Sequence, residues 1–215
     1  MGTGRSKTKE KILRTALGLF NNEGEGSISS VDIAAVMGIS PGNLYYHYKG
    51  KDAIIQELFN DFETEMRLVL GAPVNRPMNV EDNWIYLYII FEEIFDFRFF
   101  YYNLTAMLER NPELAKRFSR LLSEMSAAFE RLLSALENKG HLVFMADEKD
   151  ILSERLTAHF TYWFPYMRLR GYRGKTKALI HEGVYAALTQ ITPYWAENAE
   201  PYSVLLKEFF DEQKG

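Results

Sequence analysis

The chain has 215 residues, of which 47% are hydrophobic and 25% charged, with a formal net charge of −4 and no cysteine. This composition is ordinary for a globular protein, and the lack of cysteine excludes a disulfide framework and thiolate chemistry and fits a reducing cytosol. No apolar run approaches the roughly 20 residues that span a bilayer, and the amino terminus lacks the apolar core of a secretory signal. We therefore expect a cytoplasmic protein with no membrane segment.

The charge is distributed unevenly along the chain. Residues 1–52 carry seven Lys/Arg against five Asp/Glu, a net of +2, whereas the remainder carries 18 against 24, a net of −6. The basic residues near the start are Arg5, Lys7, Lys9, Lys11 and Arg14, opposed only by Glu10. A basic segment joined to an acidic body indicates an anionic partner for the first part only, although a solvated terminus explains the same charges.

Hydrophobic periodicity predicts four helices in the first third of the chain. Apolar residues recur at helical spacing from Ile12 to Phe20. Ser29 and Ser40 are placed to cap the amino ends of the next two helices, and Gly38 supplies the tight turn between those helices. The expected helices cover residues 8–23, 30–37, 41–48 and 51–70.

Helical patterns continue through the rest of the sequence. The expected helices cover residues 80–95, 97–110, 112–139, 147–170, 175–198 and 201–213. Pro193 falls inside the fifth of these and predicts a kink there. Neither a hairpin signal, nor strict apolar–polar alternation, nor an internal repeat occurs. The sequence therefore predicts an all-α fold.

The segment from Ser40 to Lys51 reads SPGNLYYHYKGK. Two short helices joined through a glycine turn, with a longer support helix before them, are the parts of a tri-helical DNA reader. Eight residues of helix span about 12 Å, close to the width of the B-DNA major groove, which is also about 12 Å. Leu44 and Tyr48 lie four apart and are expected to face the support helix, so the rings of residues 45–47 point away from it.

This arrangement resembles the amino-terminal module of the TetR family of bacterial transcriptional regulators over about residues 9–58. The resemblance is carried by Ile12, Ala16, Phe20, Gly24, Ile33, Ala34, Gly38, Ser40, Gly42, Leu44, Tyr45, His47, Tyr48 and Lys51. It implies a set of phosphate contacts formed by Ser30, Tyr45, His47 and Lys51. It implies a second set that lies at the bases, formed by Pro41, Gly42, Asn43 and Tyr46.

Several residues of this module keep alternative interpretations. Asn43 either continues the start of its helix or reads an adenine. Tyr45 either belongs partly to the core or contacts a phosphate, whereas Tyr48 is expected in the core. Val31 stands where some family members carry a base-reading arginine, so the operator sequence does not follow from a relative.

Aromatic residues are dense in residues 84–102 and 159–167. An aromatic stripe at helical spacing is more often core than ligand site, but this density exceeds what one helix face needs. In a TetR-like body these helices surround a ligand cavity, so the resemblance implies an apolar pocket for a hydrophobic or aromatic small-molecule effector. The expected lining residues are Tyr88, Phe91, Phe95, Phe99, Tyr102, Phe129, Trp163 and Met167.

The resemblance also implies a homodimer that binds a double-stranded DNA operator. Residues 1–52 would form the DNA-binding domain and residues 53–215 the ligand-binding and dimerisation domain. The subunit interface is expected from residues 148–170 and 175–197. Its apolar stripes are Leu152, Leu156, His159, Phe160 and Trp163 on the first segment, and Ile180, Val184, Ala187, Leu188 and Ile191 on the second.

The leading interpretation is a transcriptional regulator, most simply a repressor that a hydrophobic or aromatic small molecule releases from its operator. The sequence contains no Gly-x-Ser-x-Gly motif, phosphate loop or zinc pattern, and His141, His159 and His181 lack metal-ligand spacing. We therefore expect neither an enzyme nor a cofactor or metal. The alternative is a non-transcriptional DNA-binding protein whose helical body docks a protein partner.

Overall fold

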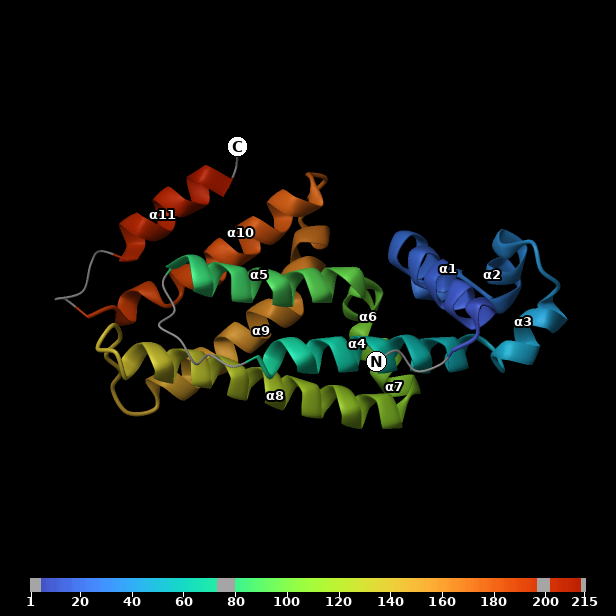
Figure 1. Cartoon of the computed structure of the whole chain (residues 1–215), viewed down its shortest axis with the longest axis horizontal. Coiled ribbons are helices and arrows are strands. Elements are labelled where there is room, and N and C mark those ends of the chain that lie inside the picture. The colour runs from blue at the N-terminus through green and yellow to red at the C-terminus, as the bar shows by residue number, and fades with distance from the viewer. Residues whose placement is uncertain (1–4, 73–79, 197–201, 214–215) are drawn as a thin grey trace. The chain divides into compact units, whose positions relative to one another are not determined.

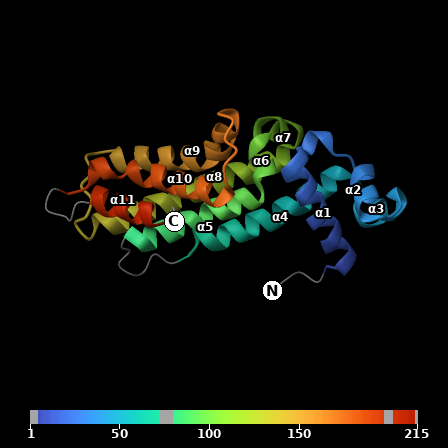
Figure 2. The same cartoon turned by 90° about the horizontal axis from the view of Figure 1, so that it is seen from above.

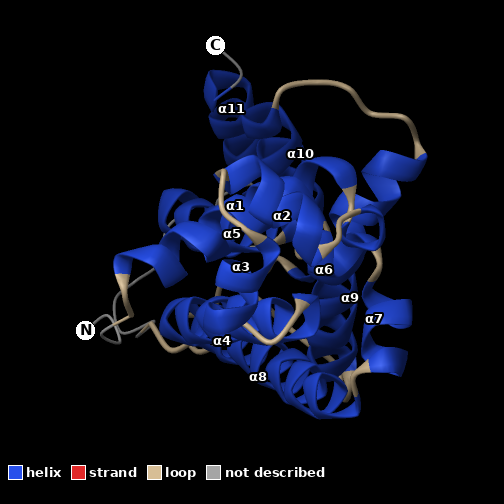
Figure 3. Ribbon diagram, turned by 90° about the vertical axis from the view of Figure 1, so that its right-hand side faces the viewer, coloured by secondary structure: helices blue, strands red, loops and turns tan. Residues whose placement is uncertain are grey.

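Helices joined by loops make up the computed structural model, which describes residues 5–72, 80–196 and 202–213. Among these residues no strand occurs (Figure 3), and the predicted all-α fold is confirmed. An isolated bridge pairs Leu142 with Trp195. In the order of Figure 1, the elements are α1 (Lys7–Glu23), the 3₁₀ turn η1 (Glu25–Ser27), α2 (Ser30–Met37), α3 (Pro41–His47), α4 (Lys51–Leu70), α5 (Val80–Asp96), α6 (Arg98–Tyr102), α7 (Leu104–Arg110), α8 (Pro112–Glu137), α9 (Glu148–Leu169), α10 (Thr176–Thr189), the 3₁₀ turn η2 (Thr192–Tyr194) and α11 (Tyr202–Gln213).

The chain divides into two compact units. Unit 1 consists of Met1–Glu65 and Asp96–Lys116, and unit 2 consists of Met66–Phe95 and Arg117–Gly215. The chain passes from one unit to the other within α4, at the last residue of α5, and in α8. Unit 1 therefore combines the amino-terminal helices with α6 and α7 from the middle of the sequence. The assignment of residues 1–52 to a DNA-binding domain and of residues 53–215 to a ligand-binding and dimerisation domain remains a prediction.

Local hydrogen bonds set the starts of the two short helices α2 and α3. The backbone N of Asp32 donates to Ser29 Oγ at 3.3 Å, and the backbone N of Ser29 donates to the Asp32 carboxylate at 2.8 Å, which completes a capping box. Gly38 ends α2 with φ 68° and ψ 31°, a left-handed conformation that glycine adopts without steric cost. The backbone N of Asn43 then donates to Ser40 Oγ at 3.2 Å and caps α3. Both predicted caps are confirmed.

Two segments differ from the prediction. Residues 97–110 were expected to form one helix, but Asn103 adopts φ −135° and ψ 32° and separates α6 from α7. In residues 175–198 the predicted kink at Pro193 is wrong, because α10 already ends at Thr189 and Pro193 lies in η2. A proline cannot donate the backbone hydrogen bond that would extend an α-helix across it.

Aromatic rings from α1, α4 and α6 form the core of unit 1. The Phe20 and Phe99 ring centroids lie 5.2 Å apart, and those of Phe59 and Phe100 lie 5.5 Å apart in an edge-on arrangement. Phe62 contacts Phe100 as well, at 6.0 Å between centroids. Such ring pairs add to the free energy gained from burial alone, so this cluster holds α6 against the amino-terminal helices.

Candidate nucleic-acid interface and aromatic core

The short helix α3 separates its buried side chains from its exposed rings. Leu44 and Tyr48 are buried, as predicted, and burial raises the pKa of the Tyr48 hydroxyl to about 12. Tyr45 and Tyr46 are 56% and 79% exposed. Large aromatic side chains that a chain leaves in solvent are candidates for contact with a partner. The exposed rings of α3 are therefore available for DNA.

The residues predicted to contact DNA lie on three consecutive helices. Ser30 is the first residue of α2, Lys51 is the first residue of α4, and Pro41, Gly42, Asn43, Tyr45, Tyr46 and His47 lie on α3. Pro41, Gly42 and Asn43 are exposed, whereas Ser30 and His47 are half-buried. The helix α2 packs against α3, which fixes α3 on the unit. The predicted base contacts and Tyr45 are thus accessible, whereas Ser30, His47 and Lys51 are only partly so.

Lys51 has a partner within unit 1 that the sequence did not indicate. Its Nζ donates to the backbone carbonyl of Glu25 at 2.9 Å and lies 2.9 Å from Glu25 Oε1. A lysine ammonium has three N–H donors, so one remains for a phosphate. Glu25 thus already holds the Lys51 side chain in the position from which it would contact DNA.

Glu25 joins Lys51 to Arg110, at the end of α7. The Glu25 side chain is fully buried, and Arg110 donates to its Oε2 at 2.9 Å. Burial alone would raise the pKa of this carboxyl, but hydrogen bonds from Lys51 and Arg110 outweigh it and lower the pKa below its ordinary value. The ion pairs connect η1, α4 and α7. Only the position of Glu25 between Gly24 and Gly26 hinted at this role, by marking a turn.

Asn21 makes a second connection between α1 and the segment from the middle of the chain. Its Nδ2 donates to the backbone carbonyl of Asp96 at 2.7 Å, and its Oδ1 accepts from the backbone N of Phe99 at 3.1 Å. One amide side chain thus satisfies two backbone groups beside the start of α6. Sequence analysis missed this residue because its partners lie more than seventy positions away in the chain.

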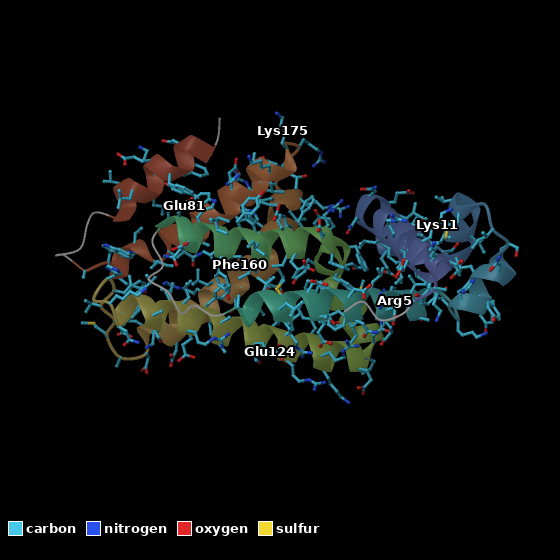
Figure 4. All side chains as sticks on the ribbon, viewed as in Figure 1. Arg5, Lys11, Glu81, Glu124, Phe160 and Lys175 are labelled. Atoms are coloured by element: carbon cyan, nitrogen blue, oxygen red, sulfur yellow. The ribbon has the colours of Figure 1, made fainter. Side chains whose placement is uncertain are left out.

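The basic residues near the amino terminus do not all remain free for an anion. The guanidinium of Arg5 donates to Glu57 at 2.9 Å and to Asp61 at 2.8 Å, both on α4 (Figure 4). Lys11, labelled on α1 in the same figure, is exposed. Lys49, which was not among the predicted contacts, lies 4.6 Å from the centroid of the Tyr45 ring. A positive charge therefore accompanies the exposed ring of Tyr45.

In unit 2 the aromatic side chains pack on one another around Phe160, a buried residue of α9 (Figure 4). The ring of Phe91 stacks on Phe160 with 4.0 Å between centroids, and Phe129 lies 5.0 Å from it. Phe164, one turn further along α9, contacts Phe91 at 5.6 Å and Phe95 at 5.4 Å. The helices α5, α8 and α9 thus share one aromatic cluster.

The structure brings six of the eight predicted pocket residues together in unit 2 and places two elsewhere. Tyr88, Phe91, Phe95, Phe129, Trp163 and Met167 belong to unit 2. Phe99 and Tyr102 lie on α6 in unit 1, where Phe99 packs against Phe20. The prediction followed one unbroken aromatic run, whereas the chain leaves unit 2 at Asp96, within that run.

The apolar stripes expected at a subunit interface are mostly buried inside the chain itself. Leu152, Leu156 and Phe160 on α9, and Ile180, Val184, Ala187, Leu188 and Ile191 in or after α10, are all buried. They therefore belong to the core of the chain itself: Phe160 packs on Phe91 and Phe129, and α10 lies beside α9 and α11 (Figures 1 and 2). The apolar and aromatic side chains that α9 leaves exposed are Ile151, Ala158, Tyr162, Tyr166 and Leu169.

Neither a membrane-spanning helix nor a metal-binding cluster emerges from residues 5–72, 80–196 and 202–213. In these ranges no helix combines the length and apolarity needed to cross a bilayer. Nor do three or more His, Cys, Asp and Glu side chains gather there as metal ligands.

Comparison with known proteins identifies relatives along nearly the whole chain. The model of bacterial regulatory proteins of the tetR family matches residues 12–58, and a model described as bacterial transcriptional repressor, TetR, matches residues 61–202. A TetR-family transcriptional regulator from Marinobacter aquaeolei VT8 is 30% identical, with a TM-score of 0.85 over 97% of this chain and 99% of that one.

Curated relatives include proteins from two distant bacteria. The HTH-type transcriptional regulator UidR of Escherichia coli K12 is 24% identical over 75% of this chain and 82% of its own length. IcaR, the negative transcriptional regulator of the icaADBC biofilm operon in Staphylococcus epidermidis, is 27% identical over 73% and 82%. Since the two family models match in chain order, one on the DNA-reading helices and one on most of the rest, the protein belongs to the TetR family of bacterial transcriptional regulators.

Proposed function

We propose that the chain is a repressor that binds an operator as a homodimer and leaves it when an apolar small molecule binds. The observation that carries the DNA-binding half is α3, which hides Leu44 and Tyr48 while exposing Tyr45 and Tyr46. An exposed helix of about two turns matches the major groove in size. Residues 1–52 read the DNA, and residues 53–215 bind the effector and the second subunit.

The proposed DNA contacts divide by role. Ser30, Tyr45, His47 and Lys51 hold phosphates, and Pro41, Gly42, Asn43 and Tyr46 meet the bases. Phosphate contacts position the protein without reading sequence, whereas base contacts specify it. Lys51 uses the ammonium donor that Glu25 leaves free, and Lys49 adds a positive charge beside Tyr45.

The second subunit docks on the exposed face of α9 in this proposal. Tyr162 and Tyr166 are 56% and 50% exposed, and Leu169 is exposed as well. Ile151, Ala158, Tyr162, Tyr166 and Leu169 follow one another at intervals of seven, four, four and three residues, which places them along one side of a helix. Sedimentation velocity tests the docking: Tyr162→Glu should yield monomer, whereas Met145→Glu, at an exposed apolar residue outside α9, should leave a dimer. A dimeric Tyr162→Glu protein would place the interface elsewhere.

Release of DNA requires that the effector prefer the conformation that does not bind the operator. A preference of about 1–3 kcal/mol is typical of such coupling. The chain offers two covalent routes, because α4 starts with Lys51 in unit 1 and continues into unit 2, and α6 and α7 follow directly from α5 of unit 2. A shift of α5 or α8 would act on Asn21 and Glu25 through the contacts of α6 and α7 within unit 1.

Three tyrosine-to-phenylalanine variants test the DNA interface. The operator is first selected from fragmented genomic DNA, and affinities are then measured by fluorescence anisotropy. Tyr45→Phe should weaken binding to all sequences about equally, by roughly fivefold to tenfold for one lost phosphate hydrogen bond. Tyr46→Phe should instead reduce discrimination between the operator and altered sites.

Tyr48→Phe is the matched control, because the Tyr48 hydroxyl is buried and lacks a hydrogen-bond partner. It should leave both affinity and discrimination unchanged. If Tyr48→Phe weakens binding as much as Tyr45→Phe, or if neither exposed tyrosine affects binding, α3 does not read DNA in this way. A protein that binds DNA without sequence preference would instead support a non-transcriptional DNA-binding role.

A further inference from the structure

Unit 2 contains two histidine–tryptophan pairs whose surroundings differ. In the first, His159 and Trp163 lie one turn apart on α9, with 5.1 Å between ring centroids. His159 Nε2 lies 3.0 Å from the backbone carbonyl oxygen of Gly183, and Trp163 Nε1 donates to the carbonyl of Leu179 at 3.0 Å. The absence of a side chain at Gly183 permits this approach, because a Cβ there would lie 2.7 Å from Trp163 Nε1. The first pair thus has its partners on α10.

The second pair, Trp84 on α5 and His181 on α10, has no such partners. Its ring centroids lie 5.6 Å apart, and the two residues are only 2% and 4% exposed. Within the part of the chain that the structure describes, Trp84 Nε1 and both ring nitrogens of His181 are buried without a hydrogen bond. Next to Trp84 on α5, Asn83 is also buried, and neither atom of its amide group has a partner.

Unpaired polar atoms at these depths are unusual in a folded protein. More than nine in ten buried polar groups have a hydrogen-bond partner, and a group that loses its water without gaining a partner costs free energy. A chain that gives His159 Nε2 and Trp163 Nε1 backbone partners but leaves Trp84 and His181 open is arranged to receive a polar group there. No residue that the structure describes supplies that group.

The side chains around the open pair indicate the chemistry of a molecule that would supply such a group. Burial and the nearby Lys177 ammonium lower the pKa of His181, so its neutral ring offers one N–H donor and one acceptor. With the indole N–H of Trp84 this gives two donors close together, and Lys177 adds a positive potential. Aromatic rings from α5 and α11 surround the pair: the ring centroid of Tyr88 lies 4.9 Å from that of His181, and those of Phe209 and Phe210 lie 5.2 and 5.8 Å from that of Trp84.

We propose that Trp84 and His181 form the polar end of the effector site and bind the carboxylate of an otherwise apolar acid. Two neutral donors and a nearby ammonium suit a carboxylate oxygen, which forms stronger hydrogen bonds than a neutral carbonyl or hydroxyl. The surrounding rings contact the apolar part of the acid. This inference rests on the proposed function, since it assigns the head group of the apolar effector.

Matched acid and alcohol probes test the head group on the full-length protein. Octanoate is compared with octanol, and naphthoate with naphthalenemethanol, by calorimetric titration and by the shift in Tm. Each acid should bind about tenfold or more tightly than its alcohol, because charge-assisted hydrogen bonds are roughly twice as strong as neutral ones. His181→Phe and Trp84→Phe should each remove most of this preference.

The variant His181→Phe also gives a readout that does not need a ligand. It replaces an unpaired polar ring by an apolar ring of similar size, so the Tm of the free protein should stay the same or rise. The control is His159→Phe, which removes the hydrogen bond to Gly183. It should lower Tm and yet keep the preference for acids.

The outcomes separate this inference from the proposed function. Equal affinity for acids and alcohols, or an acid preference that survives His181→Phe, overturns the carboxylate assignment. If no probe binds, the inference fails as well, and buried water becomes the partner of these atoms. Acids that bind through His181 without changing operator affinity support the inference but contradict effector-driven release. If alcohols release DNA as effectively as acids, effector-driven release is supported and the carboxylate assignment is contradicted.

Discussion

Unit 1 and unit 2 both have aromatic clusters, but unit 1 adds ion pairs and amide hydrogen bonds at its junctions. At the junctions of unit 1, charged and amide side chains bridge elements that are distant in sequence: Arg5 to α4, Asn21 to α6, and Glu25 to α4 and α7. In unit 2 the buried contact of α5, α8 and α9 consists of rings centred on Phe160, and hydrogen bonds from Ser126 and Lys149 add to it between α8 and α9. The ion pairs and hydrogen bonds are directional, whereas the ring contacts are not.

Under the proposed function, the difference would suit a protein that reads DNA with one part and senses a ligand with another. Hydrogen bonds and ion pairs weaken steeply when their geometry changes, so they hold the DNA-reading helices in a defined orientation. Contacts between rings depend mainly on buried area and tolerate small displacements. Under the proposed function, an aromatic body would adjust to a bound molecule, and the bridges of unit 1 would break if the helices that they join moved apart.

The largest effect is expected from removing the ring at the centre of unit 2. Phe160→Ala should lower the free energy of unfolding by about 3–5 kcal/mol, because removing a fully buried ring loses the free energy gained by transferring it out of water and leaves a cavity. The loss should be nearly independent of pH and salt, since no charge is involved. Urea denaturation at two pH values and two salt concentrations measures it.

Phe144→Ala is the control for this change, since Phe144 is only half-buried and contacts the Tyr194 ring at 5.0 Å. It should cost roughly 1–2 kcal/mol. If the two variants are destabilised equally, ring packing around Phe160 is not what holds unit 2 together.

An intermediate effect is expected at the buried carboxylate of unit 1. Glu25→Gln leaves Lys51 and Arg110 without their counter-charge, and breaking a fully buried pair costs about 3–5 kcal/mol. Because Arg110 is about half exposed, we expect a smaller loss, about 2–3 kcal/mol, together with weaker operator binding. Glu113→Gln breaks a pair with Lys116 that is exposed on both sides, and should cost less than about 1 kcal/mol.

The Glu25 contribution should also depend on pH, unlike that of Phe160. The pKa of Glu25 is lowered in the folded protein from its ordinary value of 4.5. Its stabilisation is therefore fully present above pH 4.5 and is lost as the pH falls through the folded-state pKa. The difference in unfolding free energy between the native chain and Glu25→Gln should shrink below pH 4.5. A difference that stays constant to lower pH would show that the carboxylate is not stabilised as described.

The smallest change in stability, but a clear change in regulation, is expected at Asn21. Asn21→Ala removes two hydrogen bonds to the start of α6 and should cost about 1–2 kcal/mol. Its operator affinity should remain close to that of the native chain, whereas an effector should release DNA less completely. Anisotropy titrations with and without effector measure both quantities. Asn22→Ala is the control, because Asn22 Oδ1 accepts from Arg98 in an exposed contact of 3.4 Å. An equal loss of effector-driven DNA release in both variants would argue against the Asn21 bridge.

Local features of the sequence were sufficient to predict most of the secondary structure. The caps at Ser29 and Ser40 and the turn at Gly38 each depend on atoms within a few residues, so their patterns are readable in the chain. The exposure of Tyr45 and Tyr46 followed from helical spacing alone. The break at Asn103 was not predicted, because no proline or glycine marks it.

By itself the sequence determined an all-α chain, the short reading helix α3 and membership in a family of DNA-binding regulators. Only the tertiary structure decided that Glu25 holds both Lys51 and Arg110, that Phe99 belongs with Phe20, and that His181 is open while His159 Nε2 meets the Gly183 carbonyl. Periodicity and caps depend on neighbours within about four residues. These pairings join residues tens of positions apart, and whether a buried polar atom finds a partner depends on which backbone the fold brings to it.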